Sequence, residues 1–428
     1  MKKYLAGLII IFVLGLGLPG QAYMEASSQQ PLAFEDPNLE QALKSLLNKS
    51  DDESLTKEDL KSLTDVPLAG KGIKSLQGLE YAVNMTRLSL SRNQIADISP
   101  LSDAVNLTTL DLSYNQIADI KPLGKLTKLT DLSLSRNQLN DLSALEGLVN
   151  LNTLSISSNK ITDLKPLAGL VNLNTLSISS NKITDLKPLA GLVNLWRLDA
   201  ANNNIKDLAP LSKLTNLLSL DLSSNQIYDL EPLRNLQMLA YLYLKNNRVW
   251  DLEPLQQRGF LPYYDTGAFI EPLALQNNYL DLSKGSKTTK LFVKMAGNEL
   301  PGGQRKTQRL VIGSTTAYVG DSAYRITAAP FIQTGRTYVP IRFISEKLGA
   351  AVNWNQSTKE VTIQKDGKTI RWVVGNRQVK VNQQTVMQDA PLLLKNGSAF
   401  VPVRFVAEQL NTSVEYMGSK HMVVIFKN

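Results

Sequence analysis

Apolar residues alternate with polar residues along the middle of the chain, in short runs that recur every 22 residues. Leu132-Ser-Leu134 is typical, because two apolar side chains flank a polar one, which predicts a short strand with one face turned inward. Most runs are followed by an aspartate and then by Pro-Leu, and proline cannot donate to a strand ladder, so we expect a turn or a short 3₁₀ segment there. A single unit cannot bury its leucines alone, so the pattern predicts a stack of neighbouring units.

An asparagine follows each predicted strand at the same spacing. This ladder consists of Asn93, Asn115, Asn137, Asn159, Asn181, Asn203, Asn225 and Asn247. An amide both donates and accepts hydrogen bonds, so a stacked column is expected to satisfy backbone groups at each bend. The aspartate column from Asp97 to Asp251 allows two interpretations, calcium ligands or caps of the following turn. One carboxylate per unit with apolar neighbours favours the cap.

These motifs resemble the 22-residue leucine-rich repeats of the internalin-like, protein-phosphatase-regulator-like class over residues 66–282. The resemblance implies a leucine-rich repeat solenoid with a parallel β concave face and a convex face of turns or 3₁₀ segments. The pattern returns at Asn278 after 31 residues, which predicts a last repeat with a nine-residue insertion around Pro262-Tyr263-Tyr264. Residues 147–168 and 169–190 are identical, as expected of a recent tandem duplication.

The N-terminal part predicts export followed by a cap. Lys2-Lys3, an apolar run at 5–18 and Gly20-Gln-Ala22 form a predicted signal peptide, residues 1–22, cleaved near Ala22. The run is shorter than the roughly 20 residues of a membrane span, so we expect a secreted or cell-surface chain with no transmembrane segment after cleavage. Residues 23–65 predict a helical N-terminal cap, with an amphipathic helix at 34–47 and a capping box at Thr56 and Asp59. This region resembles the cap of internalin-like proteins.

Charge and cysteine content narrow the possibilities. The chain has no cysteine, which excludes disulfides, a lipoprotein anchor and thiol catalysis. Residues 257–428 carry 22 basic and 11 acidic side chains, and residues 283–309 predict a basic flexible linker rich in glycine. The linker's basic residues are candidates for binding an anionic cell-wall polymer: Lys284, Lys287, Lys290, Lys294, Arg305, Lys306 and Arg309. The alternative is a solvated linker, and nucleic acid is a poor third choice because no recognised motif is present.

Residues 310–428 contain an internal repeat with an offset of 62 residues, in which Val339-Pro-Ile-Arg-Phe343 matches Val401-Pro-Val-Arg-Phe405. Each half predicts extended segments, a helix starting near proline, and two strands. The motif resembles the copper amine oxidase N-terminal-like ("stalk") domain, frequent in exported proteins of Gram-positive bacteria. That resemblance implies a small α+β domain without catalysis of its own. Copper in the parent oxidases is held by several histidines, and this chain has only His421, so we expect no metal and no cofactor.

Candidate ligand contacts lie late in the repeats. The centre of the predicted concave face carries only short hydroxyl side chains, namely Thr153, Ser155, Ser157 and their copies in the next repeat. Later repeats place charged and aromatic residues there: Arg197, Asp199, Asp221, Tyr241, Tyr243, Lys245 and Arg248. Such side chains are usual binding anchors. Tyr228 and Trp250 share another column, and either bind a ligand or pack against the next segment.

We find no catalytic constellation, and we expect His421 to be a surface histidine. The sequence therefore predicts an exported, non-enzymatic binding protein whose concave face recognises an unknown protein ligand. The C-terminal module is expected to associate with the cell envelope. One alternative is a structural spacer that binds wall polymer. A second is a wall-directed hydrolase with an unrecognised pair of carboxylates.

Overall fold

The computed structural model describes residues 30–257, 263–265, 268–270, 273–296 and 300–427. The predicted signal peptide lies outside these residues, as does Pro262 of the predicted insertion. The chain divides into two compact units, Met1–Ile161 and Thr162–Asn428, and each is described by itself.

The N-terminal unit begins with the predicted helical cap. Helix α2 (Pro37–Leu46) buries Leu39 and Leu43, and its N-cap, Asp36, accepts hydrogen bonds from the amides of Asn38 and Leu39. The other carboxylate oxygen of Asp36 accepts the amides of Lys74 and Ser75, at 2.5 and 3.1 Å, which ties the helix to the first repeat.

Helix α3 (Lys57–Lys61) starts with the predicted capping box. The Asp59 amide donates to the Thr56 hydroxyl at 3.2 Å, and the Thr56 amide donates to the Asp59 carboxylate at 2.8 Å. This reciprocal pair satisfies two of the amides that a helix start leaves unbonded.

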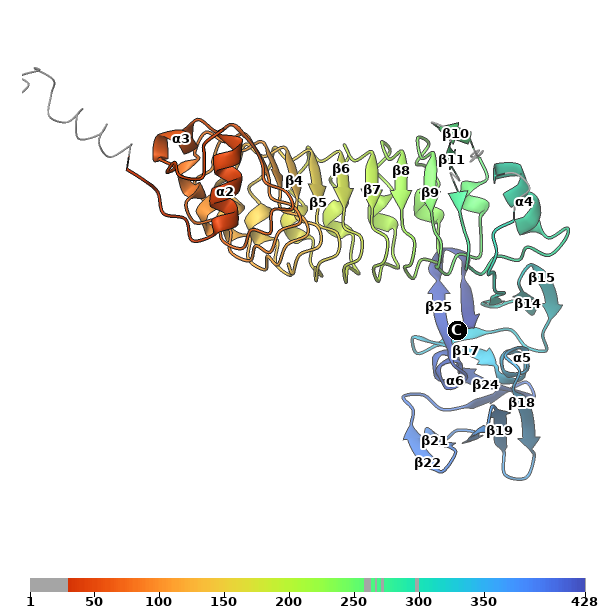
Figure 1. Ribbon diagram of the computed structural model, residues 1–428. Helices are drawn as coiled ribbons and strands as arrows, with labels where there is room; N and C mark the ends of the chain where they lie inside the picture. Colours follow the sequence, from red (N-terminus) through yellow and green to blue (C-terminus); the bar gives the residue numbers. More distant parts are fainter. Residues whose placement is uncertain (1–29, 258–262, 266–267, 271–272, 297–299, 428) are drawn as a thin grey trace, which may run out of the picture. The chain divides into compact units, whose positions relative to one another are not determined.

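The repeats follow the predicted strand-and-turn order in both units (Figure 1). The strands of the N-terminal unit are β1 (Asp65–Pro67), β2 (Arg87–Ser89), β3 (Thr109–Asp111), β4 (Asp131–Ser133) and β5 (Thr153–Ser155). Its 3₁₀ turns are η1 (Leu79–Tyr81), η2 (Ser99–Leu101), η3 (Lys121–Lys125) and η4 (Ser143–Leu145). Consecutive strands pair in parallel at the repeat spacing, as Leu110 with Leu132. The repeating leucines are buried between them.

The C-terminal unit continues the same architecture. Its repeat strands are β6 (Thr175–Ser177), β7 (Arg197–Asp199), β8 (Ser219–Asp221), β9 (Tyr241–Tyr243) and β12 (Leu273–Ala274). Its 3₁₀ turns are η5 (Lys165–Leu167), η6 (Lys187–Leu189), η7 (Ala209–Leu211), η8 (Glu231–Leu233) and η9 (Glu253–Leu255). Strand β12 pairs with β9, Leu273 opposite Leu242, so the repeat pattern resumes at β12. Between them lies a hairpin of β10 (Tyr263–Asp265) and β11 (Ala268–Ile270).

The asparagine ladder serves the backbone, as predicted. Asn137 accepts the Ile117 amide at 3.0 Å and donates to the carbonyls of Leu112 and Leu134 at 2.9 and 3.1 Å. Asn278 in the last repeat makes equivalent bonds, among them one from the Val249 amide at 2.9 Å. Each amide therefore links one repeat to the preceding one and closes the bend of its own repeat.

The aspartates of the column from Asp97 to Asp251 all accept the amide of the residue two positions further on, at 2.8 or 2.9 Å. That amide belongs to the first residue of the 3₁₀ turn, where no backbone acceptor is available. The interpretation of this column as turn caps is confirmed.

The segment 283–309 differs from the flexible linker that we expected. Helix α4 (Lys287–Ala296) occupies its centre and buries Thr288, Phe292 and Met295. The Thr289 amide donates to the Ser286 hydroxyl at 3.0 Å, which caps the helix start. The glycines suggested flexibility, but the apolar residues between them have helical spacing and a surface to cover.

The C-terminal domain consists mainly of strands with two short helices. Its first half holds β13 (Gln308–Val311), β14 (Thr316–Val319), β15 (Ser322–Arg325), β16 (Phe331–Gln333), β17 (Arg336–Pro340), α5 (Ile341–Lys347), β18 (Ala351–Asn355) and β19 (Glu360–Lys365). Its second half holds β20 (Lys368–Val373), β21 (Gln378–Val381), β22 (Gln384–Met387), β23 (Leu393–Lys395), β24 (Ser398–Pro402), α6 (Val403–Gln409), β25 (Thr412–Met417), η10 (Gly418–Lys420) and β26 (Met422–Lys427). The predicted repeat is therefore present element by element.

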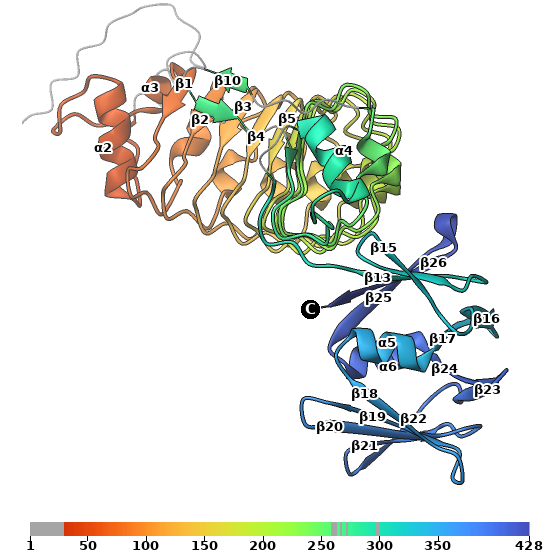
Figure 2. The same ribbon diagram turned by 90° about the vertical axis from the view of Figure 1, so that its right-hand side faces the viewer.

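The two halves share their sheets. The β26 sheet has the order β15-β14-β13-β26-β25, and the β19 sheet has the order β22-β21-β20-β19-β18, so each combines strands of both halves. A third sheet, β16-β17-β24-β23, joins the halves where Val339 pairs with Val401. Helices α5 and α6 lie side by side between the two five-stranded sheets (Figure 2). The core between these layers includes Trp372 and Phe405, whose ring centroids are 5.3 Å apart.

Candidate functional site

Strands β7, β8 and β9 bring five of the seven predicted ligand contacts together. Arg197, Ser219 and Tyr241 stand opposite one another in the sheet, and so do Asp199, Asp221 and Tyr243. The intervening leucines at 198, 220 and 242 are at most 1% exposed, so the two columns lie on the opposite, accessible face of the sheet. We call Arg197, Asp199, Asp221, Tyr241, Tyr243 and Lys245, which lies two residues after β9, the concave patch.

The patch contains two carboxylates on neighbouring strands, Asp199 and Asp221. Asp199 accepts hydrogen bonds from the hydroxyls of Ser177 and Ser179, both at 2.9 Å, and Asp221 accepts the Ser223 amide at 2.9 Å. Burial, and to a smaller extent the Asp199 carboxylate, raise the pKa of Asp221 above its usual value. A cationic group of a ligand would relieve this repulsion, so the electrostatics favour a partner with a basic side chain here.

Strands β5 and β6 present only small polar side chains at the equivalent positions. Thr153 and Ser155 on β5 correspond to Thr175 and Ser177 on β6, and the Ser155 hydroxyl lies 2.6 Å from that of Ser135. Short hydroxyl side chains offer little buried area to a partner, so β5 and β6 offer fewer anchor residues than β7–β9. Charged side chains return on the first strands, as Arg87 on β2, but without the tyrosines of β9.

Arg248 does not belong to the concave patch, contrary to the sequence prediction. Its guanidinium lies 3.7 Å from the Glu415 carboxylate and 5.9 Å from the centroid of the Phe426 ring, both in the C-terminal domain. The residue follows the bend at Asn247, where the chain has already left the strand, so its side chain leaves the concave face.

Of the two alternatives for Tyr228 and Trp250, the structure shows packing within the chain. They join Tyr279 of the last repeat and Met417, Val424 and Phe426 of the C-terminal domain in one apolar cluster, which we call the junction cluster. The Phe426 centroid lies 6.1 Å from that of Tyr228 and 5.0 Å from that of Tyr279. Strands β25 and β26 cover them, and the segment 262–264 that was predicted to do so lies outside the residues whose side chains the structure describes.

The internal repeat allows β26, which makes this contact, to be compared with its counterpart β19. Val424 and Phe426 correspond to Thr362 and Gln364 of β19, and Gln364 is exposed. Strand β19 alternates apolar and polar residues, whereas β26 is apolar from Met422 to Phe426. An unbroken apolar run is typical of a strand covered on both faces, so the sequence held a signal for this junction.

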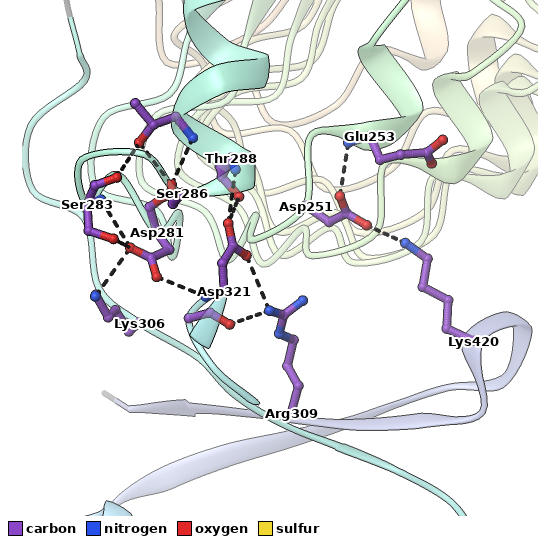
Figure 3. Close-up of polar contacts among 12 residues, drawn as sticks. Asp251, Glu253, Asp281, Ser283, Ser286, Thr288, Lys306, Arg309, Asp321 and Lys420 are labelled. Atoms are coloured by element: carbon purple, nitrogen blue, oxygen red, sulfur yellow. Dashed lines mark hydrogen bonds and ion pairs between the residues drawn. The ribbon is translucent and has the colours of Figure 1, made fainter. Parts of the chain in front are cut away.

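Polar contacts join the last repeats to the C-terminal domain, among them those of Asp251 with Lys420 and of Asp281 with Lys306 (Figure 3). Burial opposes ionisation of Asp251, but the bond and charge of Lys420, the Glu253 amide and the charge of Lys287 together lower the pKa of this carboxyl. The Arg309 guanidinium lies 4.4 Å from the Trp250 centroid and 5.0 Å from that of Tyr318, and it bonds to Asp321 and the Gly320 carbonyl. Lys206 reaches Glu415 at 3.0 Å.

A carboxylate of the last repeat fixes the start of the C-terminal domain. Asp281 is 2% exposed and accepts bonds from Ser283, the Asp321 amide and Lys306. Burial opposes ionisation, but these bonds prevail and lower the pKa of Asp281 to about 2. Gly320 permits the approach, because a Cβ at this positive φ would overlap the Asp281 carboxylate.

The predicted basic segment separates into two groups. Arg309 is largely buried and pairs with Asp321, so it was wrongly predicted as a polymer contact. Arg305 and Lys306 are exposed although they contact the Lys427 carbonyl and Asp281, so polymer binding by these two residues stays a prediction. The exposed lysines Lys284, Lys287, Lys290 and Lys294 remain, three of them on α4. Their spacing places them on the side of α4 away from Phe292 and Met295.

Two further observations concern the described part of the chain. No helix there is long and apolar enough to cross a membrane, and no group of His, Asp and Glu side chains is arranged to hold a metal ion. His421 is exposed and adopts a left-handed conformation after η10.

Comparisons with known proteins agree with the architecture. A leucine-rich repeat model matches residues 105–147, 149–191, 193–235 and 215–257, and a copper amine oxidase N-terminal domain model matches residues 318–425. Internalin C2 of Listeria monocytogenes is 38% identical with a TM-score of 0.50, and the match covers 51% of this chain and 99% of that chain. InlF, an internalin of the same organism, is 30% identical with a TM-score of 0.46, covering 63% of this chain and 90% of that chain.

A search of curated proteins found no match. The leucine-rich repeat fold of the internalins implies a protein-binding role. Because nearly the whole of internalin C2 aligns with these repeats, the chain belongs to the internalin-like leucine-rich repeat proteins, and it carries a copper amine oxidase N-terminal domain.

Proposed function

We propose that this chain is an exported, non-enzymatic binding protein whose concave patch recognises a protein ligand. The observation that carries the proposal is the change of side chains along one face. Hydroxyl residues on β5 and β6 give way on β7–β9 to an arginine, two tyrosines and two aspartates in register. Tyrosine and arginine contribute large contact areas and directed hydrogen bonds, and they dominate binding energy at protein interfaces.

The pairing of charges suggests the character of the ligand. Asp221 is partly desolvated and lies opposite Asp199, so a lysine or arginine of the ligand is expected between them. Two tyrosines on the neighbouring strand would flank such a group and exclude water from it.

Site-specific photo-crosslinking tests this proposal. A photoreactive residue replaces Ser219, which lies between Arg197 and Tyr241, and in a matched protein it replaces Thr153 on β5. We expect one protein of a host or envelope extract to crosslink from position 219 and not from position 153. Tyr243→Ala should reduce that product about tenfold or more, since an anchor residue contributes about 2 kcal/mol. Equal crosslinking from both positions would contradict a ligand site on the concave patch.

We propose further that the C-terminal part associates with the cell envelope through the exposed lysines of α4. Lys287, Lys290 and Lys294 present one basic face, and a polyanion would be held there by charge. The test measures retention of the full chain on purified cell walls, with and without their anionic polymers, across a salt series.

The informative variant replaces the three α4 lysines by glutamine, because removal of the C-terminal domain would uncover Trp250 and Tyr279. Replacement of the exposed lysines Lys121, Lys125 and Lys128 removes the same charge elsewhere and serves as control. Retention that falls with the α4 variant only, and fades with salt, supports the proposal. Equal retention of both variants contradicts it. Wall retention without any crosslinked ligand would favour the structural spacer.

A further inference from the structure

The C-terminal domain contains two grooves related by its internal repeat. Groove A, of about 510 Å³, is formed by Arg342 of α5, Trp354 of β18 and Leu394 of β23 among others. Groove B, of about 420 Å³, is formed by Arg404 of α6, Tyr416 of β25 and Ile332 of β16. Every one of these residues is offset by 62 positions from its counterpart in the other groove. Each groove combines the helix and sheet of one half with the hairpin of the other.

Most of the shared residues are on the surface. Arg342 and Arg404 are exposed, Leu394 and Ile332 are 44% and 49% exposed, and Tyr416 is 43% exposed, whereas Trp354 is partly buried against the core. The exposed pair Arg325 and Met387, which lines neither groove, has diverged in character. Two copies of one sequence have therefore kept an arginine, an aromatic ring and an aliphatic side chain around each groove. Packing accounts in part for the aromatic ring but not for the exposed arginines and aliphatic side chains, so a role in binding explains their retention.

The chemistry of the grooves suits a sugar chain that carries acidic groups. An aromatic side chain packs against the apolar face of a sugar ring while its polar edge remains hydrogen-bonded, as the Trp354 indole is to Gln356 at 2.7 Å. The arginine fork matches a carboxylate or a phosphate. Residues 310–428 carry 14 basic and 7 acidic side chains. Two carboxylates line groove B, Asp389, which is paired with Arg336 at 2.7 Å, and Glu408; beside groove A, Glu346 lies 3.7 Å from Arg342. The field around the grooves therefore favours an anionic ligand.

We propose that groove A and groove B are two equivalent subsites for an acidic glycan of repeating units. A ligand with one repeated group can use both sites, whereas a unique peptide segment could fill only one. The choice of a glycan as the ligand rests on the proposed envelope association. Recognition is assigned to the arginines and aromatic rings of the grooves, not to the lysines of α4.

The test measures binding of the full chain to three immobilised polymers. Polygalacturonate supplies carboxylates on sugar rings, phosphomannan supplies phosphates on sugar rings, and dextran is a neutral control. The groove variants are Trp354→Ala, Tyr416→Ala and the pair together, with Arg342→Gln and Arg404→Gln as exposed substitutions that leave the core intact. Arg325→Gln and Met387→Ala alter exposed residues outside the grooves and serve as controls.

We expect one acidic polymer to bind and dextran not to bind. Each single aromatic substitution should weaken binding about tenfold and the pair about a hundredfold, because distant, independent sites contribute additively. The two arginine substitutions together should act similarly, and the controls should bind as the unaltered chain does. Absence of binding to both acidic polymers, or binding by the double variant at full strength, would overturn the proposal. The α4 lysine variant should retain the groove dependence, so failure of the lysine proposal is distinguishable from failure of this one.

Discussion

The junction cluster makes a sharp prediction for Phe426→Gln. This substitution gives β26 the residue that β19 carries at the equivalent exposed position, Gln364, so the C-terminal domain should keep its fold. Its contact with the repeats should weaken, because Phe426 is 0% exposed and packs on Tyr228 and Tyr279.

The expected magnitude follows from burial. Complete burial of a phenylalanine side chain contributes about 2 to 3 kcal/mol, and each favourable aromatic pair adds about 0.5 to 1.5 kcal/mol. A glutamine amide buried without partners would cost roughly 1 kcal/mol or more besides. We therefore expect a loss of about 4 to 7 kcal/mol in docking free energy, which is a shift of at least roughly a thousandfold between docked and released forms.

Fluorine NMR of the chain labelled with 5-fluorotryptophan reports the outcome directly. Trp250 is 4% exposed and lies in the junction cluster, whereas Trp372 is 1% exposed in the core of the C-terminal domain. In Phe426→Gln the Trp250 resonance should become sensitive to solvent while that of Trp372 stays unchanged, and Gln364→Ala should leave both unchanged. A protected Trp250 in Phe426→Gln would refute the assignment of docking to the apolar face of β26.

Three further predictions concern the repeats and their end. Asn137→Ala should destabilise the chain by about 1 to 3 kcal/mol in chemical denaturation, because it leaves the buried Ile117 amide without a partner and removes one of the two side-chain bonds to each of the Leu112 and Leu134 carbonyls; the exposed Asn140→Ala should have little effect. Asp281→Asn should cost about 2 kcal/mol above pH 4, since the folded pKa of about 2 lies below the usual aspartate value of 3.8. The thermal midpoint of the Asp281→Asn variant should converge with that of the unaltered chain as the pH falls towards 2. Asp221, with a raised pKa, destabilises the folded state once ionised, so Asp221→Asn should raise the thermal midpoint at pH 7 while weakening ligand crosslinking; a lower midpoint would contradict this.

The architecture of the repeats was predictable because each repeat contacts its neighbours at a fixed spacing. Leu110 pairs with Leu132 in the sheet, and this spacing is the repeat period that is visible in the sequence. The cap helix, its capping box and the insertion before the last repeat followed from equally local patterns. The internal repeat of the C-terminal domain was visible as well, although not the sharing of each sheet between both halves.

The misplaced residues have one cause in common. Arg248 and Arg309 were assigned to ligands because each is a cation in a suggestive position, yet their partners are Glu415 and Asp321 in a domain whose placement no local pattern reveals. The bond from Tyr279 to the Lys427 carbonyl spans 148 positions. In the sequence, the unbroken apolar run of β26 is the feature that indicates such a contact.

The sharing of strands between the halves also determines the order of folding. Strands β18–β22 follow one another along the chain and pair with sequence neighbours, so the β19 sheet closes short loops and can form early. In the β26 sheet, β13 pairs with a strand synthesised more than a hundred positions later, as Leu310 pairs with Val423. Until β26 has left the ribosome, the apolar end of the repeats around Trp250 lacks the cover that Val424 and Phe426 provide. The slow, long-range closure of β13 on β26 is therefore the step that both completes the C-terminal domain and removes that exposed surface, and a chain stalled before it is the species most prone to aggregate.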